Sequence, residues 1–157
     1  MIHTRDARDE DGPGLRALIE PIFGEYEGVL FLEDEMPELA CIATTFASAG
    51  GAFYVGTLGP TIVASAGFVP HDGDRVELKK LYVARAHREC GLGGRMLARV
   101  ESEARRRGAG SVFLWSDAKF LPAHRFYRRR GYVSDGRTRV LADASATVER
   151  FFFKTLD

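Results

Sequence analysis

The sequence predicts a mixed α/β fold in which a central β-sheet of about six to seven strands is flanked by about four helices. Apolar segments with strand character, bounded by Gly and Pro, alternate along the chain with segments whose apolar residues recur at helical spacing. Residues 75–108 show this most clearly, since a strand rich in Val, Leu and Tyr leads through a glycine run into a helix. At this length and ordinary composition, residues 1–157 are expected to form one domain.

The first third of the chain predicts one strand and two helices. Residues 2–4 form a short strand, and Asp9 or Asp11 caps the helix that follows it. The side chains of this helix that face the core are Leu15, Leu18, Ile19, Ile22 and Phe23. Pro21 removes a backbone donor, so the helix is expected to kink or end near its last turn. Residues 38–47 predict the second helix.

The middle of the chain predicts a hairpin, a central strand and a long helix. Residues 53–57 and 61–69 form the hairpin, and residues 76–83 form the central strand. The apolar residues of the helix that follows recur at helical spacing, and they are Met96, Leu97, Val100 and Ala104. Gly108 follows the last turn of this helix.

The last third of the chain predicts three more strands and a short helix. Residues 111–116 form an apolar strand suited to a buried parallel position, and residues 123–130 form the helix. Residues 132–133 and 148–153 form the last strands. We expect His124 on the surface of the short helix and Cys41 in the core.

The composition excludes several classes of protein. No apolar segment approaches the length of a membrane span, and the N-terminus lacks the apolar region of a signal peptide. Cys41 and Cys90 form no disulfide framework or metal spacing, so reduced thiols in a cytoplasmic protein without a metal are expected. Arginines at 105–107 and 128–130 lack an aromatic platform, so we expect no nucleic-acid partner, and we expect no membrane partner.

The two halves of the sequence differ in charge, although the net charge is zero. Residues 1–74 contain 3 Lys and Arg against 13 Asp and Glu, and residues 75–157 contain 19 against 9. One interpretation is attraction between solvated faces of the folded chain. The other is a division of labour, with a basic half for a polyanionic cofactor and an acidic half for a cationic acceptor.

The glycine run predicts an anion site. A strand, a glycine loop and a helix in succession leave backbone N–H groups free at the positive end of the helix dipole. A dinucleotide-binding fingerprint would need glycine at Met96, and a P-loop would need Lys-Ser/Thr after its last glycine, so neither fits. The residues present, Arg88 to Gly93, form an Arg-x-x-Gly-x-Gly run after an apolar strand.

Three features of the sequence resemble the GNAT superfamily of N-acetyltransferases. They are this run, Glu77 in the strand before it, and residues 123–127 followed by Arg-Arg-Arg-Gly-Tyr. The resemblance covers nearly the whole chain and implies the GNAT fold, with acetyl-CoA as cosubstrate and no metal. It also implies direct transfer to an amine without an acyl-enzyme. The cofactor-binding residues that it implies are Leu81, Tyr82 and Val83 through their backbone, Arg88, Glu89, Cys90, Gly91, Leu92, Gly93 and Gly94 at the pyrophosphate, and Phe120 and Tyr127.

Glu77 and Tyr127 are the candidate catalytic residues. Glu77 is the candidate general base, directly or through water, and the alternative is a structural ion pair with Arg75, Lys79 or another cation. Tyr127 is the candidate general acid for the departing thiolate, and the alternative is a core aromatic side chain. The imperfect alternation of residues 77–83 predicts a β-bulge beside the site.

One position departs from the family pattern. Phe120 stands where members often carry an asparagine, seven residues before the tyrosine, so that contact is absent or comes from Ser116 or Asp117.

The acidic segment 25–35 is expected, by resemblance, to lie over the acceptor site, and the alternative is a packed loop without that role. The acceptor is therefore expected to be a primary amine with positive charge, on a small molecule or a peptide. Two alternatives stay open: a catalytically silent acyl-CoA-binding module that regulates a partner, and a structural or interaction domain. A homodimer is also possible.

Overall fold

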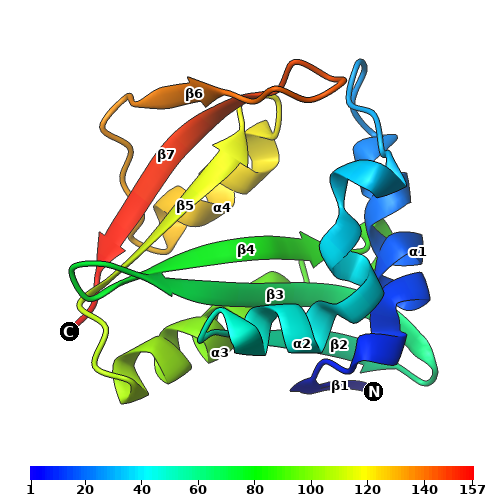
Figure 1. The fold of residues 1–157 in the computed structure, drawn as a ribbon, viewed down its shortest axis with the longest axis horizontal. Coiled ribbons are helices and arrows are strands. Elements are labelled where there is room, and N and C mark those ends of the chain that lie inside the picture. The colour runs from blue at the N-terminus through cyan, green and yellow to red at the C-terminus, as the bar shows by residue number, and fades with distance from the viewer.

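The computed structural model describes all 157 residues and contains one seven-stranded sheet, in the order β1-β2-β3-β4-β5-β7-β6 (Figure 1). The strands are β1 (Ile2–Asp6), β2 (Ala52–Leu58), β3 (Thr61–His71), β4 (Arg75–Val83), β5 (Ser111–Asp117), β6 (Thr138–Val140) and β7 (Val148–Thr155). All neighbours are antiparallel except β4 and β5, which are parallel. The mixed sheet that the sequence predicts is confirmed.

Four α-helices cover the two faces of this sheet (Figure 1). They are α1 (Gly12–Phe23), α2 (Ile42–Ser48), α3 (Leu92–Arg106) and α4 (Leu121–Arg129). One core cluster joins α1 and α2 to one face, and a larger one joins α3 and α4 to the other. None of the helices combines the length and the apolar character that crossing a membrane requires.

The N-terminal elements differ from their predictions in local detail. Asp11 occupies the N-cap position of α1, but its carboxylate does not cap the helix, because Arg5 and the Arg8 N–H occupy it. Pro21 lies inside α1, which ends two residues later, as expected. The predicted second helix begins as a 3₁₀ helix over Pro37–Cys41 before α2 starts.

Two predictions about single residues are wrong. Cys41 is exposed rather than part of the core. His124 is buried, with 2% of its surface exposed, because its Nε2 lies 2.9 Å from the Asp117 carbonyl oxygen and its ring packs on Phe152. Burial also lowers the pKa of His124, so the imidazole is neutral.

The C-terminal strands are arranged differently from the prediction. Val133 makes only an isolated bridge to Phe153, so residues 132–133 are not a strand of their own. The outermost strand is instead β6, which pairs with β7. All three residues of β6 are exposed, so it has no apolar alternation that could be recognised.

The parallel strands β4 and β5 diverge soon after they begin. They pair only over Arg75–Glu77 and Ser111–Phe113. Beyond this, β4 continues beside β3 and β5 continues beside β7, and Figure 1 shows the two strands separating toward their C-terminal ends. The edge of β4 from Leu78 to Val83 therefore faces an opening and has no strand partner on that side.

A β-bulge lies in β4 beside this opening. The pairing of β3 with β4 shifts register between Ser65 and Gly67, and Lys80 has a left-handed φ of 54°. The Ser65 hydroxyl donates a 2.7 Å hydrogen bond to the Lys80 carbonyl oxygen, which fixes the bulge. The bulge predicted from the imperfect alternation is confirmed, and it changes the direction of the strand where it borders the opening.

Candidate active site

The opening between β4 and β5 is a cleft of about 1360 Å³. The predicted site residues that line it are Glu77, Leu81, Tyr82, Val83, Arg88, Glu89, Gly91, Gly93, Gly94, Phe120 and Tyr127. Two predicted residues do not line it. The Leu92 side chain is buried in the core, and the Cys90 thiol is exposed and donates to the His87 carbonyl oxygen. The fold thus brings together residues from β4, the glycine loop and α4.

One end of the cleft is formed by the glycine loop and the N-terminus of α3. Glu89 and Gly91 adopt left-handed φ values of 64° and 84°, which turn the chain sharply into the helix. No side chain caps α3, and the first N–H groups of a helix have no intrahelical acceptor. A Cβ atom at Gly91 would meet nothing within 4 Å, so space is open in front of the loop. This geometry suits an anion.

Arg88 is held in place on this side of the cleft. Its Nε donates to the Val83 carbonyl oxygen at 3.1 Å, and its two terminal nitrogens bind both carboxylate oxygens of Glu25 at 2.7 and 2.8 Å. The hydrogen bonds that Arg88 donates to the Glu25 carboxylate raise the pKa of Arg88. The Arg88 guanidinium, which the sequence predicts at the pyrophosphate, is therefore paired with Glu25 instead.

The chain after α1, residues 24–36, bridges the two walls of the cleft; we call it the bridging segment. Besides the ion pair of Glu25, the Lys119 ammonium donates to the Glu27 carbonyl oxygen at 3.0 Å. Farther along, the Leu30 N–H donates to the Ser145 hydroxyl at 3.0 Å, and the Ala144 N–H donates to Glu35 at 2.8 Å. Figure 1 shows this segment meeting the loop between β6 and β7. The acidic segment thus lies over the cleft.

Tyr127 projects from α4 into the cleft, with 6% of its surface exposed. Its ring packs against Phe126 and Tyr132, with centroids 5.4 and 5.7 Å away. No protein group hydrogen-bonds its hydroxyl, and burial alone raises the pKa of Tyr127 far above its usual value. The phenol therefore stays protonated at neutral pH and remains a hydrogen-bond donor toward the cleft.

Phe120 packs into an aromatic cluster at the start of α4. Its ring centroid lies 4.6 Å from that of Tyr26 and 6.2 Å from that of Phe23. The cluster belongs to the junction of α1, α4 and the bridging segment, which an asparagine could not fill. Ser116 and Asp117, the expected substitutes for that asparagine, both line the cleft.

Glu77 stands where β4 and β5 separate, with 8% of its surface exposed. Its Oε1 lies 2.9 Å from Nε2 of His71, and its Oε2 lies 3.9 Å from the Lys79 ammonium. Arg75 does not pair with Glu77, because its guanidinium lies over the Phe113 ring at 4.9 Å. The sequence pattern did not indicate His71 as a partner of Glu77. In the β3–β4 hairpin Val69 pairs with Glu77, and this register could have indicated that His71, two residues later, lies nearby.

The walls of the cleft differ in charge. The glycine loop, the turn before it and α4 contribute five arginines and one carboxylate, namely Arg85, Arg88, Arg125, Arg129, Arg130 and Glu89. The other walls contribute six carboxylates and three basic side chains, namely Glu35, Glu38, Glu77, Asp117, Asp143, Glu149, Lys79, Lys80 and Arg139. Lys80 pairs with Glu38 at 2.6 Å, and Arg139 pairs with Glu149 at 2.7 Å. The acidic walls therefore have no unpaired arginine.

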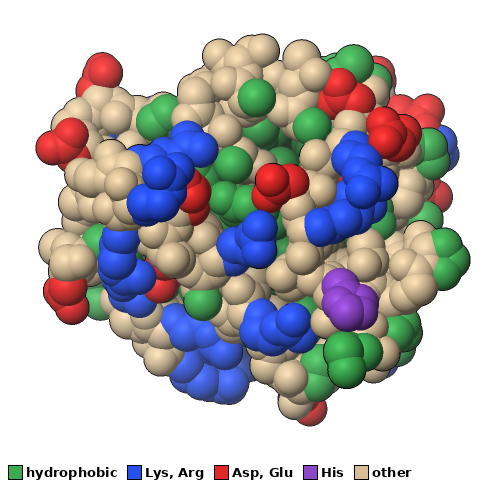
Figure 2. All heavy atoms as spheres, turned by 90° about the horizontal axis from the view of Figure 1, so that it is seen from below, with side chains coloured by type: hydrophobic (Ala, Val, Ile, Leu, Met, Phe, Trp, Pro, Cys, Tyr) green, Lys and Arg blue, Asp and Glu red, His purple; other side chains and the backbone are tan.

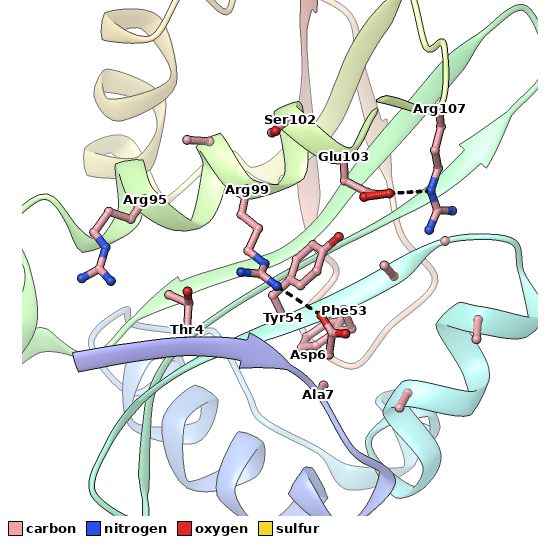
Figure 3. A pocket seen from close by; sticks show the side chains of 15 residues that line it. Thr4, Asp6, Ala7, Phe53, Tyr54, Arg95, Arg99, Ser102, Glu103 and Arg107 are labelled. Carbon is pink, nitrogen blue, oxygen red and sulfur yellow. Dashed lines mark hydrogen bonds and ion pairs between the residues drawn. The ribbon is translucent and has the colours of Figure 1, made fainter. Parts of the chain in front are cut away.

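A second hollow, of about 940 Å³, lies at the other edge of the sheet between α2, α3 and β1. Basic and acidic side chains are interspersed on this face (Figure 2). Figure 3 shows Arg99 reaching toward Asp6, at 3.3 Å, and Arg107 paired with Glu103, also at 3.3 Å. Arg95 donates to the Ile2 carbonyl oxygen. The hollow contains none of the predicted site residues, and its charges are satisfied by the protein itself.

Neither cavity contains a recognisable metal site. No group of three or more His, Cys, Asp or Glu side chains is placed to hold a metal ion.

Comparisons with known proteins identify relatives of the chain. Residues 15–132 match the model of the acetyltransferase (GNAT) family. A GNAT-family acetyltransferase from Staphylococcus aureus Mu50 is 22% identical, with a TM-score of 0.84 over 100% of both chains. An acetyltransferase from Streptococcus agalactiae 2603 is 18% identical, with a TM-score of 0.82 over 99% of this chain and 98% of its own.

A third solved structure contains a ligand. The PaiA N-acetyltransferase from Thermoplasma acidophilum, solved in complex with coenzyme A, is 15% identical, with a TM-score of 0.77 over 99% of both chains. No curated protein matches the sequence. At these low identities the solved structures show the fold alone, whereas the family model covers most of the chain.

Proposed function

The chain belongs to the acetyltransferase (GNAT) family, and from this premise we propose that it transfers the acetyl group of acetyl-CoA directly to a positively charged primary amine. The observation that carries the proposal is the divergence of β4 from β5 beside the uncapped N-terminus of α3. The unpaired strand edge offers hydrogen-bond donors for the extended arm of the cosubstrate. The free N–H groups at the start of α3 offer donors for its phosphates. The PaiA structure holds coenzyme A in the same fold.

The residues of the cleft fit this cosubstrate. The N–H groups of Leu92, Gly93 and Gly94, at the uncapped start of α3, would bind the phosphates, and the arginines of α4 would add positive charge there. Alternate backbone N–H and C=O groups between Leu81 and Val83 lie along the free edge of β4, where they would bind the pantetheine arm and polarise the thioester carbonyl. Arg88 joins the phosphate site when its guanidinium is released by, or shared with, Glu25.

Two side chains supply the proton transfers. Glu77 removes a proton from the ammonium form of the acceptor, directly or through water, which leaves a neutral amine to attack the carbonyl carbon. Tyr127 donates its hydroxyl proton to the departing thiolate, because burial keeps the phenol protonated. The nucleophile is the acceptor itself, so no cysteine of the chain forms an acyl intermediate.

The charge of the walls supports a cationic acceptor. Acetyl-CoA is a polyanion, and it would lie along the wall that contributes five arginines. The remaining walls carry more carboxylates than basic groups, and Glu35 and Asp143 have no ion-pair partner there. Such walls attract an ammonium group and repel a carboxylate. Polyamines, aminoglycosides or a basic peptide therefore fit better than a free amino acid.

An acceptor screen tests the proposal. CoA release from acetyl-CoA is measured with polyamines, aminoglycosides, basic peptides and free amino acids, and a saturable rate with a cationic amine is expected. The acceptor KM should rise with salt and with the pair Glu35→Gln and Asp143→Asn, because both changes weaken the attraction of the wall. Binding of acetyl-CoA without turnover on any amine would instead indicate a silent acyl-CoA-binding module.

A further inference from the structure

His71 is a half-exposed imidazole in contact with the buried carboxylate of Glu77. Its Nε2 lies 2.9 Å from Glu77 Oε1, and 40% of its side chain is exposed, whereas 10% of the Glu77 side chain is. Both side chains line the cleft. Resting on the function proposed above, we propose that His71 acts through Glu77 as the proton outlet of the reaction, which returns Glu77 to its basic form after each transfer.

The problem that such an outlet solves follows from the burial of Glu77. A carboxylate that has taken a proton from the acceptor must lose it before the next turnover. With so little exposed surface, Glu77 has limited contact with water while products fill the cleft. A neighbouring group that both accepts a proton and reaches solvent removes this restriction.

Among the groups around Glu77, only His71 can do this. The Lys79 ammonium is 3.9 Å away, beyond hydrogen-bond distance, and has no lone pair to accept a proton. Arg75 lies over Phe113 and does not reach the carboxylate. An imidazole has one nitrogen for Glu77 and a second for water, so it can accept a proton on the first and release one from the second.

The position of the imidazole is fixed by packing rather than by other charges. Its ring stands edge-on to Phe113 of β5, with centroids 5.0 Å apart and planes at 72°. Two charged groups contact this arrangement: Lys79, on the other oxygen of Glu77, and Arg75, over the same phenyl ring. The ring is thus held with Nε2 toward Glu77 by apolar contact.

The transfer balances as the passage of one proton. The N–H bond of the acceptor ammonium breaks and an O–H bond forms on Glu77. In the tautomer of His71 that carries its proton on Nδ1, Nε2 takes the Glu77 proton and the Nδ1 proton passes to water. Glu77 is again ionised and accepts a hydrogen bond from the Nε2–H group. Exchange of the His71 proton from Nε2 back to Nδ1 through water completes the cycle.

His71→Gln tests this role. Glutamine keeps an amide N–H that can hold Glu77 in place but does not carry protons at neutral pH. We expect turnover at saturating substrates to fall at least tenfold in dilute buffer, and imidazole or concentrated phosphate buffer to restore much of it. The acidic limb of the pH profile should also change shape. Acetyl-CoA affinity should stay the same, and His3→Gln, on the exposed surface of β1, should behave as the wild type.

A purely structural histidine would respond differently. In that case His71→Gln would retain wild-type turnover, or would lose activity that no buffer restores, and either result overturns the inference. Should His71→Gln fold poorly, a second comparison replaces it: the double variant Glu77→Gln with His71→Asn is measured against Glu77→Gln alone. With the base already absent, loss of the outlet should lower turnover no further, and an additional tenfold loss overturns the inference. A wild-type protein that transfers no acetyl group refutes the proposed function itself.

Discussion

Two tyrosines that pack against each other should respond in opposite ways to loss of the hydroxyl. Tyr127 and Tyr132 are both buried in the same core cluster, with ring centroids 5.7 Å apart. Tyr127→Phe removes a hydroxyl that faces the cleft without a protein partner. Tyr132→Phe removes one that donates to Glu101 at 2.8 Å inside the core. The two variants therefore separate catalysis from stability.

The structure sets the size of each effect. A buried hydrogen bond to a charged group contributes about 1.5–3 kcal/mol, so Tyr132→Phe should lower the free energy of unfolding by about 2 kcal/mol. Lys154 keeps Glu101 paired at 3.1 Å, which limits the loss. Tyr127→Phe removes no protein hydrogen bond, so the unfolding free energy should change by less than about 0.5 kcal/mol.

Turnover should show the reverse pattern. If Tyr127 protonates the thiolate, Tyr127→Phe should lower kcat about a hundredfold, which is about 2.7 kcal/mol in the barrier, with acetyl-CoA affinity nearly unchanged. Tyr132→Phe should keep wild-type kcat. Steady-state kinetics and urea unfolding of both variants measure the four values. Wild-type turnover in Tyr127→Phe would refute its role as the acid, and a large loss of stability there would show that it serves the core.

Three further predictions follow from the cleft and the core. Gly93→Glu should weaken acetyl-CoA binding at least tenfold, about 1.4 kcal/mol or more, because it adds negative charge and its Cβ would lie 3.1 Å from the Phe126 ring. Calorimetry measures this affinity, and an unchanged value would contradict the phosphate site. Glu25→Gln should strengthen acetyl-CoA binding about threefold or more, since it frees Arg88 and removes a negative charge; weaker binding would show that the ion pair orders the site. Burial lowers the pKa of His124, so the unfolded chain binds the proton first and the free energy of unfolding should fall as the pH drops below about 6.5. In urea titrations His124→Gln should reduce this dependence of the unfolding free energy on pH. An equal dependence in the variant would mean that other groups cause it.

The fold and much of the site could be predicted because local patterns determine them. Glycines before an apolar helix fix the loop at the N-terminus of α3, and the imperfect alternation around Lys80 revealed the bulge. Gly131 marked the end of α4, and the resemblance to the family singled out Tyr127 on that helix. These features depend on residues close together in sequence, which periodicity and turn chemistry describe well.

The errors concern contacts between residues of different elements. The spacing of His124 in a basic helix indicates an exposed position, but the carbonyl oxygen of Asp117 at the end of β5 gives its ring a buried partner. No sequence pattern indicated that Glu101, on a charged helix, lies in the core beside Tyr132 and Lys154. The pairing of Arg88 with Glu25 joins residues 63 positions apart. A cytoplasmic location and a homodimer stay predictions.

A single-turnover experiment with isotopically labelled acetyl-CoA tests the central claim most directly. The wild-type protein is mixed with labelled acetyl-CoA and the best cationic amine, quenched at successive times, and both the intact protein and the small molecules are weighed by mass spectrometry. Direct transfer in the cleft predicts that the label moves from acetyl-CoA to the amine nitrogen while the protein, including Cys41 and Cys90, stays unlabelled at every time. Label that appears first on the protein, or only in free acetate, would contradict the account.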